Sequence, residues 1–288
     1  MLRPGVMMGY THASTWNSLW SIMILAVATQ KGGSAKTTTV VNLGAALAER
    51  GKRVLIVDLD PQAHATYWLL GPDGRRWGPF VQEWLEAADL NPVRPSGWPG
   101  LDIVPANQEL SRIRERWDPL NRPTDARQLQ SRLTPMLPDY DWILLDCPAS
   151  FDALTQAALL GADGVIVPVG PPEPLAVDGL HHMLSAIRRL QDDQNPRLRL
   201  LGVLISNVRL EYGIQRRALE HLEQARLPLF STMIASSARI GAAAEQHRPI
   251  LSTAPRSFVS DSYRVLSLEV EKRARGWLWN WVAGTAGA

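Results

Sequence analysis

The chain has 288 residues, which is the size of one large domain or two small ones. Hydrophobic residues make up 45% of it and charged residues 20%, so a packed core can form and wholesale disorder is excluded. The single cysteine, Cys147, excludes an intramolecular disulfide framework and a zinc site built from cysteines. No apolar run reaches the ~18 residues of a membrane span, and we expect a cytoplasmic protein.

The net charge of +2 hides an asymmetry along the chain. Residues 1–187 carry 15 basic and 19 acidic side chains, whereas residues 188–275 carry 15 basic and nine acidic ones. This distribution indicates a basic surface in the C-terminal part. Only four of the 30 basic residues are lysines, and two of these, Lys31 and Lys36, stand in one short segment.

Apolar runs of strand length recur along the chain, and most are continuous rather than alternating. Such runs are typical of strands buried on both faces, as in a parallel sheet covered by helices. The predicted strands are residues 22–29, 53–58, 101–105, 142–146, 164–169 and 198–206.

Segments with helical spacing of apolar residues lie between these strands, at residues 36–50, 176–190, 213–225 and 258–275. Strands that alternate with helices predict an α/β fold with a doubly wound, mostly parallel sheet flanked by helices. We expect a single domain over residues 22–275, with a Gly-, Pro- and Trp-rich insertion at 71–100. Residues 1–21 are interpreted as a mobile extension and 276–288 as a tryptophan-containing tail.

A glycine-rich segment directly follows the first predicted strand and precedes a helix. It reads Gln30-Lys31-Gly32-Gly33-Ser34-Ala35-Lys36-Thr37-Thr38. This context is the one that a phosphate loop needs, because glycines let backbone N–H groups turn inward around phosphate oxygens. We expect residues 32–38 to bind nucleotide phosphates, with Lys36 at the β- and γ-phosphates and the Thr37 hydroxyl on Mg²⁺. Ala35 places a Cβ where the backbone approaches phosphate closely.

Carboxylates follow two of the predicted strands. Asp58 and Asp60 stand at the end of the second strand, in Val57-Asp58-Leu59-Asp60-Pro61-Gln62, and Asp146 ends the strand 142–146. The carboxyl ends of parallel strands border the ligand crevice of an α/β sheet. An aspartate there is the usual water-mediated partner of Mg²⁺ in phosphate-loop enzymes.

With these motifs, the sequence resembles the ParA family of ATPases with a deviant Walker A motif. The loop Lys-Gly-Gly-x-x-Lys-Thr-Thr, the segment Val-Asp-x-Asp-Pro-Gln, the Asp-Cys-Pro strand end and Val167-Pro168-Val169 match in family order. The likeness covers roughly residues 22–275. Two positions depart from the family pattern: Ala35 replaces a glycine, and Ala235-Ser236 replaces a Pro-Arg pair.

The resemblance implies an ATPase that binds ATP and Mg²⁺ and closes into a homodimer with the nucleotides between the subunits. Lys31 would then be the signature lysine that reaches the partner's nucleotide. Asp60 would position the attacking water, while Asp58 and Asp146 would support Mg²⁺ and the switch. Asn207 could read the adenine edge, and a simple turn residue is the alternative.

The resemblance further implies non-specific DNA binding, slow hydrolysis stimulated by a ParB-like adaptor, and association with the nucleoid. Such an ATPase would segregate or position DNA or another cargo. Such DNA binding is electrostatic. The candidate residues are arginines of the basic C-terminal part, namely Arg209, Arg216, Arg217 and Arg239.

Three other functions are weighed against this one. A MinD-like ATPase would cycle on a membrane through the tail, where Trp277, Leu278, Trp281 and Val282 share one helical face. A redox iron protein on the same scaffold needs two cysteine ligands per subunit, and Cys147 is alone. A degenerate nucleotide-binding scaffold disabled by Ala35 conflicts with the complete set of carboxylates.

Overall fold

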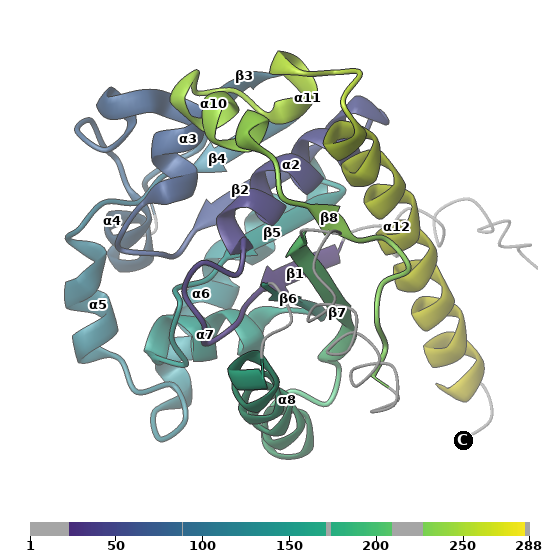
Figure 1. Cartoon of the computed structure of the whole chain (residues 1–288). Coiled ribbons are helices and arrows are strands. Elements are labelled where there is room, and N and C mark those ends of the chain that lie inside the picture. Colours follow the sequence, from purple (N-terminus) through teal and green to yellow (C-terminus); the bar gives the residue numbers. More distant parts are fainter. Residues whose placement is uncertain (1–22, 88, 171–173, 209–226, 286–288) are drawn as a thin grey trace, which may run out of the picture.

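The computed structural model describes residues 23–87, 89–170, 174–208 and 227–285. Within them the chain forms an eight-stranded sheet in the order β3-β4-β2-β5-β1-β6-β7-β8. Neighbouring strands are parallel except for the antiparallel pair β3–β4 at one edge (Figure 1). The strands are β1 (Met23–Val27), β2 (Val54–Asp58), β3 (Arg94–Trp98), β4 (Leu101–Val104), β5 (Trp142–Asp146), β6 (Gly164–Val169), β7 (Arg199–Val208) and β8 (Ile234–Ala235).

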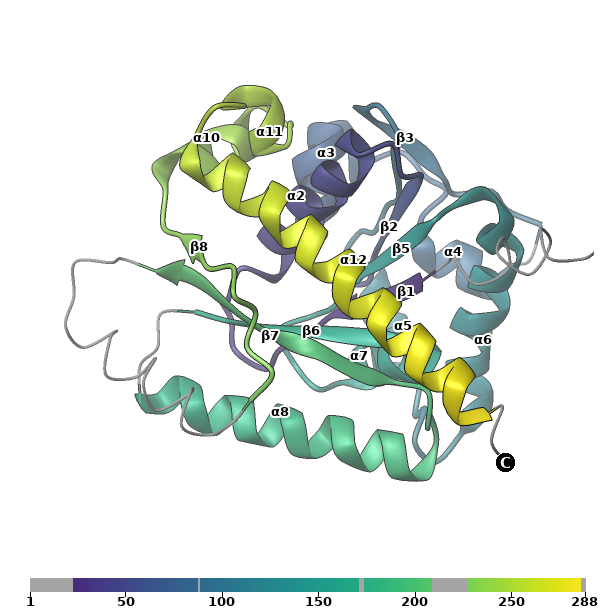
Figure 2. The same cartoon turned by 90° about the vertical axis from the view of Figure 1, so that its right-hand side faces the viewer.

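Helices cover both faces of the sheet (Figure 2). One face carries α2 (Lys36–Glu49), α3 (His64–Gly74), α10 (Ala238–Glu245), α11 (Ile250–Thr253) and α12 (Phe258–Thr285). The other carries α4 (Val81–Glu86), α5 (Leu110–Arg116), α6 (Pro123–Leu133), α7 (Ala153–Gly161) and α8 (Pro174–Asp193), with a short 3₁₀ helix, η1 (Thr134–Asp139), after α6. The predicted fold class is therefore confirmed.

Two separate apolar cores explain why the central strands carry continuous apolar runs. Along β1, Leu25 and Val27 enter the core under α2 and α12, whereas Ile24 and Ala26 enter the core under α7 and α8. All five residues of β1 are buried. Successive side chains of a strand point to opposite faces, so both faces must be apolar when both are covered.

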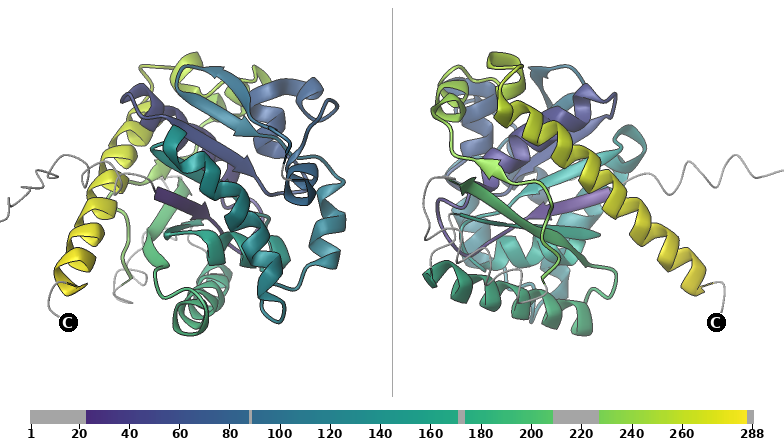
Figure 3. Two further views of the ribbon diagram at one scale, coloured as in Figure 1. Left: turned by 180° about the vertical axis from the view of Figure 1, so that it is seen from behind. Right: turned by 45° about the vertical axis from the view of Figure 1, so that its right-hand side comes forward.

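All six predicted strands are present, and the structure adds two that were not predicted, β3 and β8. Residues 71–100 include α4 and β3, which extends the sheet beyond β4 (Figure 3). The predicted helix 213–225 lies outside the described residues. Helix α12 continues through residues 276–285. None of the helices in the described ranges is long and apolar enough to cross a membrane.

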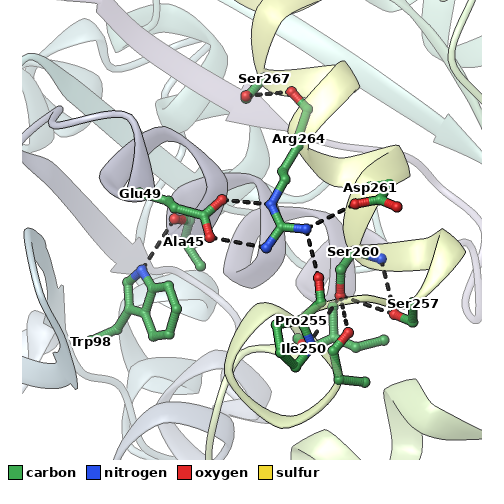
Figure 4. Close-up of polar contacts among 11 residues, drawn as sticks. Ala45, Glu49, Trp98, Ile250, Pro255, Ser257, Ser260, Asp261, Arg264 and Ser267 are labelled. Atoms are coloured by element: carbon green, nitrogen blue, oxygen red, sulfur yellow. Dashed lines mark hydrogen bonds and ion pairs between the residues drawn. The ribbon is translucent and has the colours of Figure 1, made fainter.

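Hydrogen bonds and an ion pair join the beginning of α12 to α2 (Figure 4). The Arg264 guanidinium donates to both carboxylate oxygens of Glu49, at 2.7 and 3.0 Å, and to Asp261 at 2.8 Å. Asn42, buried in α2, accepts a hydrogen bond from the Ile250 N–H at 2.8 Å. These contacts hold α11 and α12 against the helix that begins at the phosphate loop.

Candidate nucleotide-binding site

The carboxyl ends of β1, β2 and β5 meet at one edge of the sheet. Val27 of β1 and Asp58 of β2 both lie beside Asp146 of β5 in the strand register. The chain leaves β1 toward α2 and β2 on one side, while β6 pairs with the other side of β1. A change of direction of this kind produces the ligand crevice of open α/β sheets.

The segment 30–35 connects β1 to α2 through two residues with positive φ. Gly33 has φ 71°, and Ala35, the residue before α2, has φ 67° and ψ 30°. Ala35 has no side chain that could accept a hydrogen bond from the first turn of α2. The free N–H groups and the positive end of the helix dipole make this turn a site for an anion.

The left-handed conformation of Ala35 gives a testable consequence. A Cβ in this region costs about 1 kcal/mol or more, whereas glycine adopts it freely. We expect Ala35→Gly to raise the free energy of unfolding by about 0.5–1 kcal/mol and to tighten nucleotide binding. Denaturant unfolding and fluorescent-nucleotide titration measure the two effects. Ala48→Gly, at a helical position within the same α2, should destabilise the protein by about 1 kcal/mol. If Ala35→Gly and Ala48→Gly changed the free energy of unfolding in the same direction, the inferred strain at Ala35 would be contradicted.

Lys36 begins α2 and is 7% exposed. Burial lowers the pKa of its ammonium from the usual value, and the carboxylates of Asp146 and Asp60 oppose that shift. Burial also raises the pKa of Asp146 well above its usual range, and the Asp58 carboxylate adds to this effect. A buried cation thus faces a group of buried acids, an arrangement that frequently marks functional sites.

Three polar atoms at this position fit a Mg²⁺–nucleotide ligand. The Thr37 hydroxyl donates to Asp146 Oδ2 at 2.8 Å. Asp146 Oδ1 and Ser34 Oγ are buried and have no hydrogen-bond partner within the described residues. No group of three or more His, Cys, Asp or Glu in the described part of the chain could hold a metal ion by itself. Mg²⁺ takes one or two protein ligands together with phosphates and water, and the Thr37 hydroxyl and the Asp146 carboxylate would supply the protein groups here.

Asp58 is fully buried, and its carboxylate bonds to protein groups. Oδ2 accepts from the backbone N–H and the hydroxyl of Thr66, at 2.9 and 2.7 Å, and Oδ1 accepts from the Asp60 N–H at 3.1 Å. Burial raises the pKa of Asp58 to about 6. The Thr66 hydroxyl in turn accepts from the Ala106 N–H at 2.8 Å. Asp58 thus holds the segment around Asp60 and the start of α3 in place, which fits the switch part of its expected role.

The structure brings the other predicted site residues together only in part. Gly32, Gly33 and Lys31 are exposed at the front of the loop, and Asp60 is half-buried beside it. Asn207 is exposed near the end of β7 with φ 57°. Asparagine tolerates this backbone conformation well, so the turn alone accounts for its presence. Its adenine contact stays a prediction.

Of the predicted DNA-binding arginines, Arg239 is exposed on α10. Arg209, Arg216 and Arg217 lie outside the described residues.

Sequence reasoning missed Thr66, because nothing local marks a threonine eight positions after Asp58 as its partner. Cys147 is buried behind Asp146, and burial raises the pKa of its thiol.

Comparisons with known proteins agree with this geometry. A family model described as "AAA domain" matches residues 22–200. The chromosome-partitioning ATPase Soj of Thermus thermophilus is 36% identical, over 87% of this chain and 96% of its own length. The chromosome partitioning protein ParA of Caulobacter vibrioides is 32% identical, over 88% and 96%. The sporulation initiation inhibitor protein Soj of Bacillus subtilis is 35% identical, over 86% and 97%.

Solved structures show the same fold. A cobyrinic acid a,c-diamide synthase from Mycobacterium smegmatis, with bound ADP and magnesium, superposes with a TM-score of 0.72 at 33% identity, covering 85% of this chain and 92% of its own. The cell division ATPase MinD of Pyrococcus furiosus, at 22% identity, covers 87% of this chain and 98% of its own with a TM-score of 0.69, and so shows the fold alone.

The sheet, the loop before α2 and the strand-end carboxylates together define a phosphate-loop ATPase of the deviant Walker A class. Within that class, the chain belongs to the ParA/Soj family of partition ATPases. The predictions of ATP and Mg²⁺ as cofactors and of ATP hydrolysis as the reaction are confirmed at the level of this family.

Proposed function

We propose that this ATPase closes into an ATP-dependent sandwich homodimer, binds DNA without sequence preference and hydrolyses ATP slowly under stimulation by a ParB-like adaptor. In this way it segregates or positions DNA or another cargo at the nucleoid. One observation carries the proposal, namely the different settings of the two loop lysines. Lys36 is buried beside the carboxylates, whereas Lys31 is exposed at the front of the same loop. The exposure of Lys31 supports a role at the nucleotide of a second subunit.

The chemistry follows from these positions. Phosphoryl transfer needs mainly positioning and neutralisation of charge. Lys36 binds the phosphates of its own subunit's nucleotide, and Lys31 adds its charge only when two subunits meet. Bound Mg²⁺ supplies further neutralisation of the phosphate charge. Hydrolysis then depends on dimerisation, so ATP turnover limits the lifetime of the dimer. The test is size-exclusion chromatography with light scattering: ATP and not ADP should give a dimer, and Lys31→Ala should stay monomeric with ATP.

The DNA surface is supported by two unpaired arginines. Arg239 and Arg256 line a hollow of about 470 Å³ between α10 and the beginning of α12, and no acidic side chain lines it. Neither arginine forms an ion pair within the described residues. Three other arginines on the same face are paired, namely Arg50 with Glu271, Arg264 with Glu49, and Arg273 with Glu269. Unpaired guanidinium groups remain available for backbone phosphates.

We expect Arg239→Ala combined with Arg256→Ala to weaken binding of the ATP-bound protein to DNA of any sequence about tenfold or more at low salt. The slope of log affinity against log salt should also fall by about one unit for each lost phosphate contact. Fluorescence anisotropy over a salt series measures both quantities. Arg112→Ala, which removes an exposed arginine of α5 paired with Glu109, is the control and should leave DNA affinity unchanged. Unaltered DNA binding by the double variant would remove Arg239 and Arg256 from the surface.

The membrane-cycling alternative rests on the tail. Helix α12 runs without interruption through residues 276–285, directly after the basic Lys272 and Arg275. A basic stretch followed by tryptophans on a helix suits a lipid interface. Co-sedimentation with anionic liposomes in ATP, with and without residues 276–288, distinguishes this function from DNA binding.

A further inference from the structure

The four residues Asp60-Pro61-Gln62-Ala63 form a tight turn between β2 and α3, which we call the Asp60 turn. The Ala63 N–H donates to the Asp60 carbonyl at 2.7 Å, and the Gln62 N–H donates to Asp60 Oδ1 at 2.9 Å. Ala63 is buried and adopts φ 52° and ψ 45°. A Cβ disfavours this left-handed conformation, so other contacts must hold the turn in it.

Arg75 supplies such contacts from the far end of α3. Its Nε donates to the Ala63 carbonyl at 3.0 Å, and its Nη2 donates to the Gln62 carbonyl at 2.9 Å. Helix α3 bends at Gly71, whose φ is 68°, and this bend precedes the turn in which the Arg75 N–H donates to the Pro72 carbonyl. Arg75 therefore binds two successive carbonyls of the turn from which α3 begins.

The Arg75 guanidinium is itself fixed on one side by an aromatic ring. It lies 4.7 Å from the centroid of Tyr67, a cation–π contact. The Tyr67 ring meets the ring of His247 edge to face at 4.9 Å, and His247 Nδ1 lies 3.0 Å from the Tyr67 carbonyl oxygen. Arg75 forms no ion pair with an acid in the described part of the chain, so its guanidinium serves the Gln62 and Ala63 carbonyls.

We propose that Arg75 is a positioning residue for ATP hydrolysis. Gln62 connects the two groups, because its N–H binds the Asp60 carboxylate and its C=O binds Arg75. The guanidinium keeps Ala63 in its left-handed conformation and thereby sets the direction of the Asp60 carboxylate toward the attacking water. This inference rests on the proposed role of Asp60 in hydrolysis.

The experiment measures ATP turnover and nucleotide affinity of the full chain with DNA present. Arg75→Ala should lower kcat about tenfold and leave the ATP KM within twofold. Misplacement of a catalytic group lowers the rate, and the side-chain hydrogen bonds of Arg75 in the described part of the chain go to the Asp60 turn, not to the phosphate loop. Arg75→Lys keeps the charge but loses the planar guanidinium that binds two carbonyls at once, so its kcat should also be lowered. Arg76→Ala, which removes the exposed neighbouring arginine, should leave kcat unchanged.

A double-mutant cycle separates positioning from general stability. Glycine at position 63 holds the left-handed turn without help, so Ala63→Gly should restore most of the kcat lost in Arg75→Ala. If Arg75→Ala lowered kcat equally with and without the Ala63→Gly substitution, the proposal would be overturned, as it would by an Arg75→Ala variant with full kcat. Thermal unfolding confirms that each variant is folded at the assay temperature. Asp60→Ala tests the proposed role of Asp60 independently: if it stays active, that role fails, whereas an inactive Asp60→Ala with a fully active Arg75→Ala refutes only the role of Arg75.

Discussion

Lys36→Ala should abolish ATP hydrolysis and weaken ATP binding at least about 100-fold. The Lys36 ammonium begins α2 and interacts with the carboxylates of Asp146 and Asp60, and its charge opposes the burial that raises the pKa of Asp146. Removing it leaves negative phosphates to meet negative carboxylates in a poorly solvated site, where charge interactions are strong. Isothermal titration with a non-hydrolysable ATP analogue and a phosphate-release assay measure the two losses.

Lys52→Ala is the matched control for this variant. Lys52 follows the opposite end of α2, about 20 Å from Lys36 at 1.5 Å per helical residue. It should bind and hydrolyse ATP as the unmodified protein does. Phosphate release from Lys36→Ala equal to that of Lys52→Ala, in the presence of DNA and adaptor, would rule out the phosphate-loop mechanism.

Strands that are covered on both faces could be predicted from the sequence, because continuous apolar runs follow directly from double burial. Strand β3, the antiparallel strand at the edge of the sheet, could not be predicted in this way. Strand β3 contains Pro95 and Gly97, which disfavour a strand, and contacts with β4 and with α2 hold it in place. Ser96 Oγ donates to the Leu101 carbonyl at 2.6 Å, and the Trp98 indole donates to the Ala45 carbonyl at 3.1 Å.

In the site, too, local motifs could be predicted from the sequence, whereas contacts that form only on folding could not. The phosphate loop and the strand-end aspartates are local motifs, so the approach of Asp58 to Asp146 could be predicted from their places at the ends of parallel strands. Thr66, Arg75 and Arg256 become functional candidates only through folding. Thr66 and Arg75 meet their partners because α3 packs against the end of β2, and Arg256 lines the same hollow as Arg239 because the start of α12 lies beside α10. No residue type or spacing near these three residues indicates those positions.

Asp60→Asn should lower the rate of ATP hydrolysis at least about 100-fold while ATP affinity changes less than about threefold. Asp60 is half-buried at the end of the second strand, and its Oδ1 is the acceptor for the Gln62 N–H. Asparagine keeps that acceptor and the size of the side chain, so the turn is preserved. It removes the negative charge that would orient a water for attack on the γ-phosphate. We expect nucleotide affinity to depend on residues 32–38, which the substitution leaves in place.

A protein that binds ATP but does not hydrolyse it should accumulate as the dimer. Asp60→Asn should therefore remain dimeric for hours with ATP, whereas the unmodified protein should return to monomer as ATP is consumed. Chromatography at fixed times after ATP addition follows this difference. Asp73→Asn, which changes an exposed aspartate of α3, should behave as the unmodified protein. Normal turnover by Asp60→Asn would show that the water is oriented elsewhere. Loss of ATP binding would instead place Asp60 in the nucleotide site itself, since a group that acts only on the attacking water contributes to the rate and not to ground-state affinity.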